Sequence, residues 1–402
     1  MMIASSYRLH RRAGRRWLCG LMVLAAGLGL VGCSGNGESS GEGSGAAGAS
    51  PAARHIANAL DGFVTNGQTS GYAFLMVGRD SDGNFSVLDQ RADGSYLDDG
   101  EPMTLDTPVL LASASKGPAA AAILTLVDQG KLNLDTPVST YLASMGVSWP
   151  LGKAAITLRM LLDHTSGLPG IFSPKQPACI DVLDKGGATS ESMQQCVQDI
   201  ANSTLQAIPG NRFIYGGADY QVAGYIAYRT AGAASWPAFF KSALAGPLGA
   251  ATLTYSASQI NPRVAGGAVA SAADYVKFLE MLLADGQYNG RSILNASSVT
   301  ALRTSQIGTL TATPPTGATA SDFSGYSFGF FQDAPATYAP SPGPEFSDQG
   351  IFGETPWIDY GLNYAAVLLI GQIPSGGSAL AIGTDMWQAI HGYAVTLAQQ
   401  QP

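Results

Sequence analysis

Apolar residues along the chain predict strands near both ends and helices in between. Ile56, Leu60 and Val64 recur at helical spacing within 54–64, and the apolar runs 71–77 and 84–88 that follow are typical of strands. Helical periodicity then continues through 117–129, 156–162, 220–230, 236–244 and 272–283. Beyond Gly325 we expect strands at 326–331, 346–352 and 363–371, and a last helix at 384–399. This order predicts an α+β fold, in which both termini contribute to one sheet and a helical region is inserted.

The composition is that of a globular protein with a sizeable core. Of the 402 residues, 46% are hydrophobic and only 12% are charged, which excludes coiled coils and disordered tails. The formal net charge is −8, and the five arginines at 8–16 all precede Glu38, the first acidic residue. An acidic body of this kind repels phosphate backbones, so we expect no nucleic-acid partner.

The first 32 residues predict a signal peptide. Arginines at 8–16 precede the apolar run 17–32, which is too short and too rich in glycine to span a bilayer well. Its last four residues, Leu30-Val31-Gly32-Cys33, resemble the lipobox of bacterial lipoproteins, whose cysteine is lipidated and becomes the first mature residue. An ordinary signal peptide with a chance cysteine is the alternative.

The residues after Cys33 are typical of a flexible tether, because Gly and Ser dominate 34–50. We therefore expect a signal peptide over 1–32, a lipidated Cys33 with its tether over 33–52, and a folded domain over 53–402. The lipid anchor would be the sole membrane contact. It would hold the domain at the bacterial cell envelope, facing the periplasm or the exterior.

Cys179 and Cys196 remain once Cys19 and Cys33 are assigned to the N-terminal segment. In an oxidising compartment we expect them to form a disulfide, and two unpaired buried thiols are the alternative. The four histidines lie far apart in the sequence, and none has metal-ligand spacing. We expect neither a metal nor an organic cofactor.

Ser113 and Lys116 are the clearest candidate chemistry. They lie three residues apart where an apolar extended run enters a helix, so they share one helix face. A serine hydroxyl needs a base to become a nucleophile, and a lysine can serve if burial and the helix terminus lower its pKa. The Ser113 N–H, at the start of that helix, could stabilise an oxyanion. On spacing alone, an exposed lysine after a serine cap explains the pattern as well.

Three further blocks follow in the order of a known family. The chain resembles the serine β-lactamase-like superfamily, which includes class C β-lactamases, D-alanyl-D-alanine carboxypeptidases and family VIII esterases. The likeness covers roughly 55–395 and rests on the Ser113 block with 130–138, on 156–169 (ITLRMLLDHTSGLP), on Pro209-Gly210 with Phe213 and Tyr215, and on Gly266-Gly267 with Asp274 and Phe278. It implies a β-lactamase/transpeptidase-like fold with an antiparallel sheet flanked by helices.

The resemblance implies roles for three side chains. Ser113 corresponds to the acylated nucleophile, Lys116 to its base, and Tyr215 to the first residue of the Y-x-N motif, whose phenol passes a proton to the leaving group. His164 belongs to a block that is a structural turn in this family, so we interpret it as scaffold rather than as a base.

Two motifs depart from the family pattern. Tyr215-Gly216-Gly217 lacks the asparagine of Y-x-N, and Asp348-Gln349-Gly350 stands where relatives have Lys-Thr-Gly or His-x-Gly. We expect Gly217, Asp348, Gln349 and Gly350 to line the substrate site, with Gly350 on an edge strand and the Ile351 N–H as the second oxyanion donor. The Asp348 carboxylate would repel the carboxylate of a β-lactam or a D-Ala terminus.

These departures favour an esterase that acts on neutral carboxylic esters through a Ser113 acyl-enzyme, as a monomer. A class C-type β-lactamase or D-alanyl-D-alanine carboxypeptidase acting on a cell-wall-related substrate is the first alternative. A catalytically weak binding lipoprotein of the envelope is the second. A rival hydrolase pattern is G-x-S-x-G at 325–329 with Asp359 and His391, but no helix is expected after Ser327.

Overall fold

The protein is represented by a computed structural model that describes residues 50–97, 100–180, 191–314, 322–333, 343–374 and 376–401. The predicted signal peptide, Cys33 and nearly all of the tether lie outside these residues. Ser50–Pro402 forms one compact unit. Helix α1 (Pro51–Thr65) already begins at Pro51, because the Ser50 hydroxyl caps it by accepting from the Ala53 amide.

A seven-stranded antiparallel sheet joins the two ends of the chain, as the sequence predicts. Its order is β2-β1-β12-β11-β10-β9-β8, so the N-terminal strand β1 pairs with the C-terminal strand β12. The strands are β1 (Gly71–Arg79), β2 (Phe85–Gly94), β8 (Phe323–Tyr326), β9 (Phe331–Asp333), β10 (Glu345–Ser347), β11 (Thr355–Asp359) and β12 (Tyr364–Ile370).

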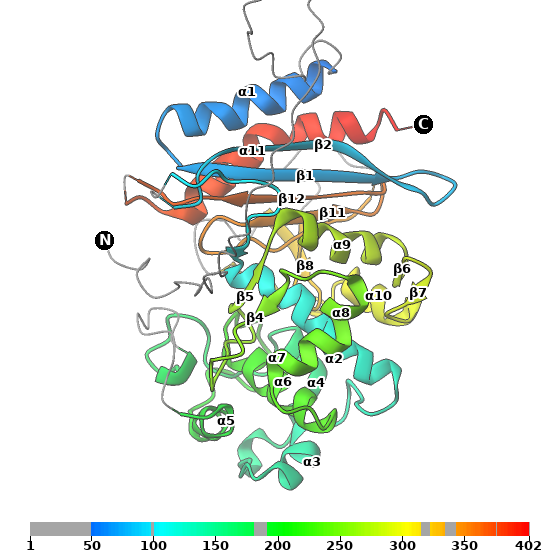
Figure 1. The fold of residues 1–402 in the computed structure, drawn as a ribbon. Coiled ribbons are helices and arrows are strands. Elements are labelled where there is room, and N and C mark those ends of the chain that lie inside the picture. Colours follow the sequence, from blue (N-terminus) through cyan, green and yellow to red (C-terminus); the bar gives the residue numbers. More distant parts are fainter. Residues whose placement is uncertain are drawn as a thin grey trace, which may run out of the picture. The chain divides into compact units, whose positions relative to one another are not determined.

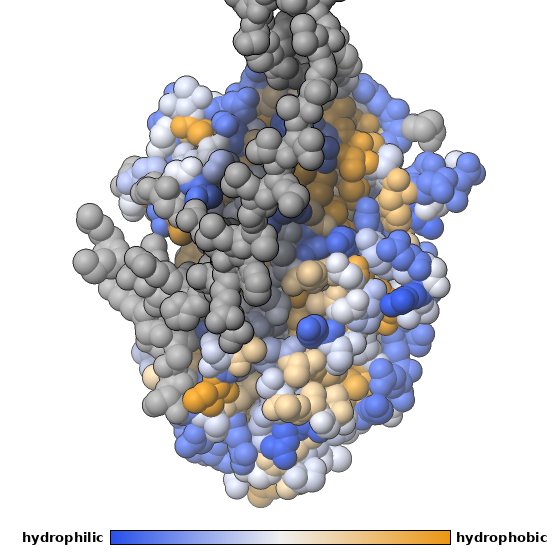
Figure 2. Space-filling model, viewed as in Figure 1, coloured by the Kyte–Doolittle hydropathy of each residue, from blue (hydrophilic) through white to orange (hydrophobic). Residues whose placement is uncertain are grey.

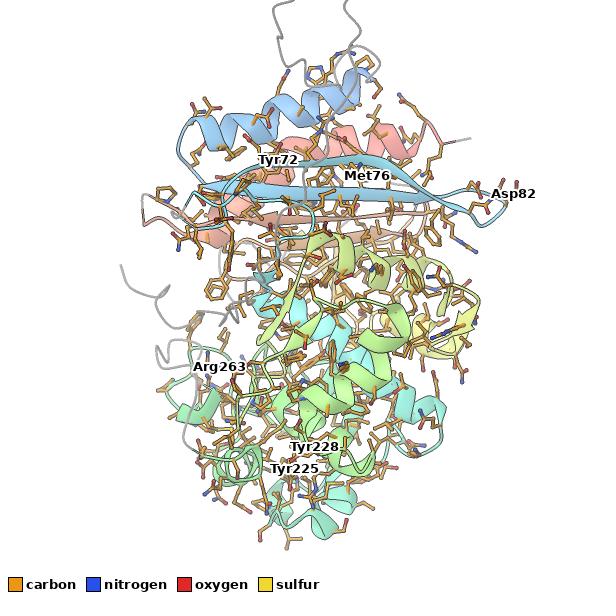
Figure 3. The ribbon with its side chains drawn as sticks, in the orientation of Figure 1. Tyr72, Met76, Asp82, Tyr225, Tyr228 and Arg263 are labelled. Atoms are coloured by element: carbon orange, nitrogen blue, oxygen red, sulfur yellow. A yellow bond between two sulfur atoms is a disulfide. The ribbon has the colours of Figure 1, made fainter. Side chains whose placement is uncertain are left out.

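Helices cover both faces of this sheet. In Figure 1, α1 and α11 (Ala379–Ala398) lie side by side on one face, while α9 (Ala272–Leu283) packs against the other. Tyr72 of β1, labelled in Figure 3, donates from its hydroxyl to Asp61 Oδ1 of α1 at 2.6 Å. Because both faces are covered, strands β1 and β12 are buried along almost their whole length.

The inserted helical region lies beyond α9, away from α1 and α11 (Figure 1). Its helices are α2 (Lys116–Asp128), α3 (Val138–Leu142), α4 (Leu158–Leu162), α5 (Met193–Asn202), α6 (Ala218–Thr230), α7 (Trp236–Phe240), α8 (Gly246–Leu248) and α10 (Ala296–Leu302). Helix α2 is rich in alanine and buried over most of its length, which lets its neighbours approach closely. Tyr225 of α6, labelled in Figure 3, donates to the Met145 carbonyl at 2.7 Å.

Two small sheets complete the described elements. One has the order β3-β5-β4, built from β3 (Val109–Leu110), β5 (Ala268–Ala270) and β4 (Thr254–Tyr255). The other is the hairpin of β6 (Gln287–Tyr288) and β7 (Arg291–Ser292). The first matters for the site, because β3 leads directly into the segment that contains Ser113.

Several predicted elements need correction. The strand expected at 326–331 is wrong: β8 ends at Tyr326, a turn with Gly329 at φ +93° follows, and β9 begins at Phe331. The strand expected at 346–352 ends at Ser347, and residues 348–354 form a loop before β11. Strand β11 and helices α5 and α10 were not predicted, and α11 begins five residues earlier than expected.

The predicted disulfide is confirmed, since Cys179 is bonded to Cys196 of α5.

None of the helices within the described ranges has both the length and the apolar character that crossing a bilayer requires. On the face shown in Figure 2, polar residues are prominent along the margins, and hydrophobic residues are visible toward the middle.

Candidate active site

Ser113 lies where a short strand turns into a helix. After β3, the 3₁₀ segment η1 (Ala112–Ser115) leads directly into α2. Ala112 has φ +43°, an unfavourable value for a residue with a Cβ, and such strain often marks a functional turn. Hydrogen bonds fix the segment on β5: the Leu111 amide donates to the Ala268 carbonyl at 2.9 Å, and the Ala268 amide donates to Ser115 Oγ at 3.1 Å.

Lys116 is buried next to Ser113. Its Nζ donates to Ser113 Oγ at 3.0 Å and to the Ala265 carbonyl at 3.1 Å. Lys116 as a whole is only 3% exposed. Burial lowers the pKa of Lys116 to about 8, although the charges of Asp348 and Asp219 act in the opposite direction. A neutral amine is therefore accessible near neutral pH, and it can accept the Ser113 proton.

Tyr215 completes this group. The Lys116 Nζ lies 4.3 Å from the centre of the Tyr215 ring, and the Tyr215 hydroxyl pairs with the Ser113 side chain. Tyr215 is 6% exposed, and burial together with the nearby Asp348 carboxyl raises the pKa of its phenol well above the usual value. The phenol therefore stays protonated and is suited to donate or pass on a proton. The structure thus brings Ser113, Lys116 and Tyr215 together.

His164 supports the site from behind Tyr215. Its ring centre lies 4.8 Å from that of Tyr215, and its Nδ1 is 2.8 Å from Asp219 Oδ2. Asp219 also accepts from the Ser166 hydroxyl. Burial, and the charge of Lys116, lower the pKa of His164, so the imidazole is neutral. This environment agrees with the interpretation of His164 as scaffold.

The third motif, Asp348-Gln349-Gly350, lies in the loop 348–354 between β10 and β11. The prediction that Gly350 lies on an edge strand is wrong, because the preceding strand β10 pairs with β11 on one side and with β9 on the other. Asp348 is fully buried, and neither carboxylate oxygen meets hydrogen-bond geometry with a described residue. Burial raises the pKa of Asp348 well above its usual range, while Lys116 and the Tyr215 hydroxyl partly oppose this. A raised pKa reduces the negative charge on which the predicted repulsion of anionic substrates depends.

The other predicted binding residues lie in different surroundings. Gln349 is directed to α11, because its Oε1 accepts from the Thr384 hydroxyl at 3.0 Å. Gly217 precedes α6, and a Cβ there would lie 3.9 Å from Ile180, next to the disulfide. Gly350 faces the Leu111 carbonyl, and Ile351 is half-buried in the turn that follows.

Sequence reasoning missed two groups that contact the site residues, the Ala265 carbonyl and Asp219, and it also missed the buried carboxyl of Glu354 in the loop 348–354. The Ala265 carbonyl is a backbone group, which the residue type does not reveal. Asp219 lies in the first turn of α6, and its contacts with His164 and Ser166 join segments far apart in the sequence. For Glu354, the sequence contains no pattern that indicates burial, apart from its position between two strands.

The rival hydrolase pattern is not assembled. The Ser327 hydroxyl is buried and faces the Phe330 carbonyl at 3.4 Å. His391 Nε2 is bound to Glu345, and Asp359 Oδ1 accepts from the Gly361 and Leu362 amides. The three side chains thus have separate partners.

Potential metal ligands gather at one place in the described part of the chain: Cys179, Glu191 and Cys196. Two of these three residues form the disulfide, which leaves no thiolate to bind a metal ion.

Comparison with known proteins places this geometry in context. The family model described as Beta-lactamase matches residues 56–387. An uncharacterized protein of Mycobacterium tuberculosis (strain CDC 1551 / Oshkosh) is 28% identical over 254 residues, which are 52% of this chain and 62% of that protein. Penicillin-binding protein 4 of Amycolatopsis lactamdurans is 27% identical over 240 residues, 52% of this chain and 60% of its own. The chain thus spans about three fifths of the length of these relatives.

Esterases are also among the similar proteins. Esterase EstB of Burkholderia gladioli is 40% identical over 84 residues, which are 20% of this chain and 21% of EstB. The solved structure of EstCE1, described as a hydrolase with promiscuous acyltransferase activity, superimposes with a TM-score of 0.68 at 22% identity, covering 85% of this chain and 98% of EstCE1. This superposition establishes the shared fold.

Proposed function

Because the chain belongs to the β-lactamase family of serine hydrolases, we propose that it hydrolyses neutral carboxylic esters through an acyl-enzyme on Ser113. The observation that carries the proposal is the 3.0 Å separation of Lys116 Nζ and Ser113 Oγ in surroundings from which water is largely excluded. A base and a nucleophile within hydrogen-bond distance, with the base kept partly neutral by burial, are what acyl transfer requires.

The reaction begins with acylation of Ser113. Neutral Lys116 accepts the Ser113 proton while Oγ attacks the ester carbonyl carbon, and the carbonyl oxygen becomes an oxyanion facing the Ser113 and Ile351 N–H groups. The tetrahedral intermediate then expels the alkoxide, which takes a proton through the Tyr215 hydroxyl, replenished from Lys116. Water next attacks the acyl-enzyme with the same groups in reverse roles, releasing the acid and restoring the Ser113 hydroxyl.

The choice of a neutral ester rests on what the site lacks. Relatives use a cation at the position of Asp348 to attract a substrate carboxylate, and here a buried carboxyl with a raised pKa stands there. Gly217 supplies no side-chain amide to hold an acylamino group. An ester also needs less help than an amide, because an alkoxide leaves more readily than an amine.

The test compares wild-type protein with Ser113→Ala and with Ser327→Ala as a matched control, because Ser327 is the nucleophile of the rival pattern. We expect short-chain nitrophenyl ester turnover and fluorophosphonate labelling to fall by at least about 10³-fold in Ser113→Ala and to persist in Ser327→Ala. Equal turnover by wild type and Ser113→Ala would overturn the proposal. Efficient hydrolysis of nitrocefin, or stable labelling by a fluorescent penicillin, would favour the β-lactamase or carboxypeptidase alternative. Labelling with neither reagent would favour a binding lipoprotein.

A further inference from the structure

Glu354 is a buried carboxyl that the proposed reaction does not use. It closes the loop 348–354, is 2% exposed, and its Oε2 has no hydrogen-bond partner within the described part of the chain. Removing such a group from water without a full set of partners costs free energy. A residue held in this state calls for an explanation in terms of what it contacts.

The Glu354 side chain folds back over its own loop. The backbone N–H groups of Phe352 and of Glu354 itself face the carboxyl and favour its ionised form. A Cβ on Gly350 would overlap Oε2, so the carboxyl lies against this glycine. The main chain closes the same loop, because the Gly350 amide donates to the Glu354 carbonyl at 2.7 Å. Glu354 therefore fills the inside of the turn that contains Ile351.

This loop also lies against the segment that leads to Ser113. A Cβ on Gly350 would be 2.7 Å from the Leu111 carbonyl oxygen, so the two backbones are in direct contact. Tyr96 faces the same place: the Leu110 backbone is near its hydroxyl, and the charge of Glu354 contributes to raising its pKa. The Glu354 carboxyl thus lies where the loop of Ile351 meets the start of the nucleophile segment.

We propose that Glu354 is a positioning residue that packs the loop 349–353 against Leu111, so that the Ile351 and Ser113 N–H groups keep the spacing an oxyanion requires. The proposal rests on the proposed function. Two donors that are fixed before the reaction stabilise charge that develops in the transition state, whereas they add little to binding of the neutral ester. Loss of Glu354 should therefore lower kcat far more than it changes KM.

The protonation state of Glu354 adds a second readout. Burial raises the pKa of Glu354 to about 8, so the carboxyl is mostly neutral at pH 7 and ionises above pH 8. Among the described residues, the Tyr96 phenol interacts with its charge, and Asp348, itself buried with a raised pKa, lies at the other end of the loop. An ionised Glu354 puts a negative charge inside the loop that carries the Ile351 N–H, where it opposes the negative charge of an oxyanion. Activity should therefore fall as pH rises through about 8.

The experiment measures kcat and KM for a neutral nitrophenyl ester in wild type, Glu354→Ala and Glu354→Gln. The control is Glu280→Gln, which removes a partly buried carboxyl with a raised pKa from α9. We expect Glu354→Ala to lower kcat by about 10²-fold with KM changed less than about threefold. Glu354→Gln should keep kcat at pH 7 within about threefold, because the amide retains the shape of the neutral carboxyl. Its activity should no longer fall as pH rises through about 8. Glu280→Gln should match wild type.

Hydrogen exchange read by mass spectrometry tests the packing without any reaction. Peptides covering 349–353 and 109–115 should exchange faster in Glu354→Ala than in wild type, Glu354→Gln or Glu280→Gln. If exchange rises in this way but no protein hydrolyses esters, the positioning role survives and the proposed function fails. Unchanged kcat and exchange in Glu354→Ala, beside Ser113-dependent turnover, would overturn the positioning role. If Glu354→Ala does not fold, the pH profile of Glu354→Gln decides. A fall of activity above about pH 8 that persists in Glu354→Gln overturns the positioning role, and loss of that fall supports it.

Discussion

Lys116 is subject to opposing electrostatic effects. Burial disfavours its ammonium form, and the carboxyls of Asp348 and Asp219 favour it, with the result that its pKa lies at about 8. The group is therefore neither permanently charged nor fully neutral at physiological pH. A small change in these surroundings alters the fraction of molecules in which the Lys116 amine is neutral and can accept the Ser113 proton.

A prediction on pH follows from this pKa. Because the neutral amine is the base, kcat/KM should rise as pH increases from about 6 toward 8. Lys116→Arg, which remains charged at any accessible pH, should lower kcat/KM by at least about 10³-fold across the range. Exposed Lys131 gives the matched control, Lys131→Arg, with wild-type kinetics expected. A rate independent of pH below 8, or substantial turnover by Lys116→Arg, would show that another group is the base.

Asp348 illustrates what residue type alone conceals. Its carboxyl was expected to repel anionic substrates, which presumes a charge facing the site. The structure buries the side chain completely, and this raises the pKa well above the usual range. The residue type is evident from the sequence, but the depth of burial is not, because it depends on packing between the loop and the helical region.

At the scale of elements, the strongest sequence patterns gave reliable helices and strands. The helices at 272–283 and 220–230 and the strands at 71–77 and 363–371 all form, because their apolar residues repeat with a clear period or run. The strand at 326–331 failed because Gly329, at φ +93°, reverses the chain within an apolar run. Strand β11 was missed because both of its faces are buried, so its apolar and polar residues do not alternate as in a half-exposed strand, and because it contains a proline.

Helix α5 depends on a lysine from outside the helix. The Lys153 ammonium donates to the Ile200, Ala201 and Ser203 carbonyls at 2.8, 2.7 and 2.7 Å, where the helix leaves its last carbonyls without partners. Lys153→Met should lower the free energy of unfolding by about 1–3 kcal/mol, because these carbonyls lose their donor in a buried place. Thermal denaturation measures the effect against Lys131→Met, an exposed control. Equal melting temperatures for both variants would contradict the role of Lys153.

At the scale of the whole molecule, the remaining question is where the domain resides. We propose that a lipid on Cys33 holds it at the cell envelope, since residues 30–33 resemble a lipobox and a Gly/Ser-rich stretch follows. When the full chain is produced in a bacterium that processes lipoproteins, it should fractionate with membranes and enter the detergent phase. Cys33→Ala should move it to the soluble fraction while ester turnover per molecule is retained. Wild-type protein in the soluble fraction would instead indicate an ordinary signal peptide.

The place of β1 in the sheet has a consequence for biosynthesis. Residues 72–78 pair with 364–370, so one side of an early strand stays without its partner until the ribosome has made residues 364–370. The sheet is therefore completed late in synthesis, and until then the first hairpin offers an unpaired edge. A chaperone that binds this edge during synthesis would keep the chain from pairing there with another molecule until residues 364–370 arrive.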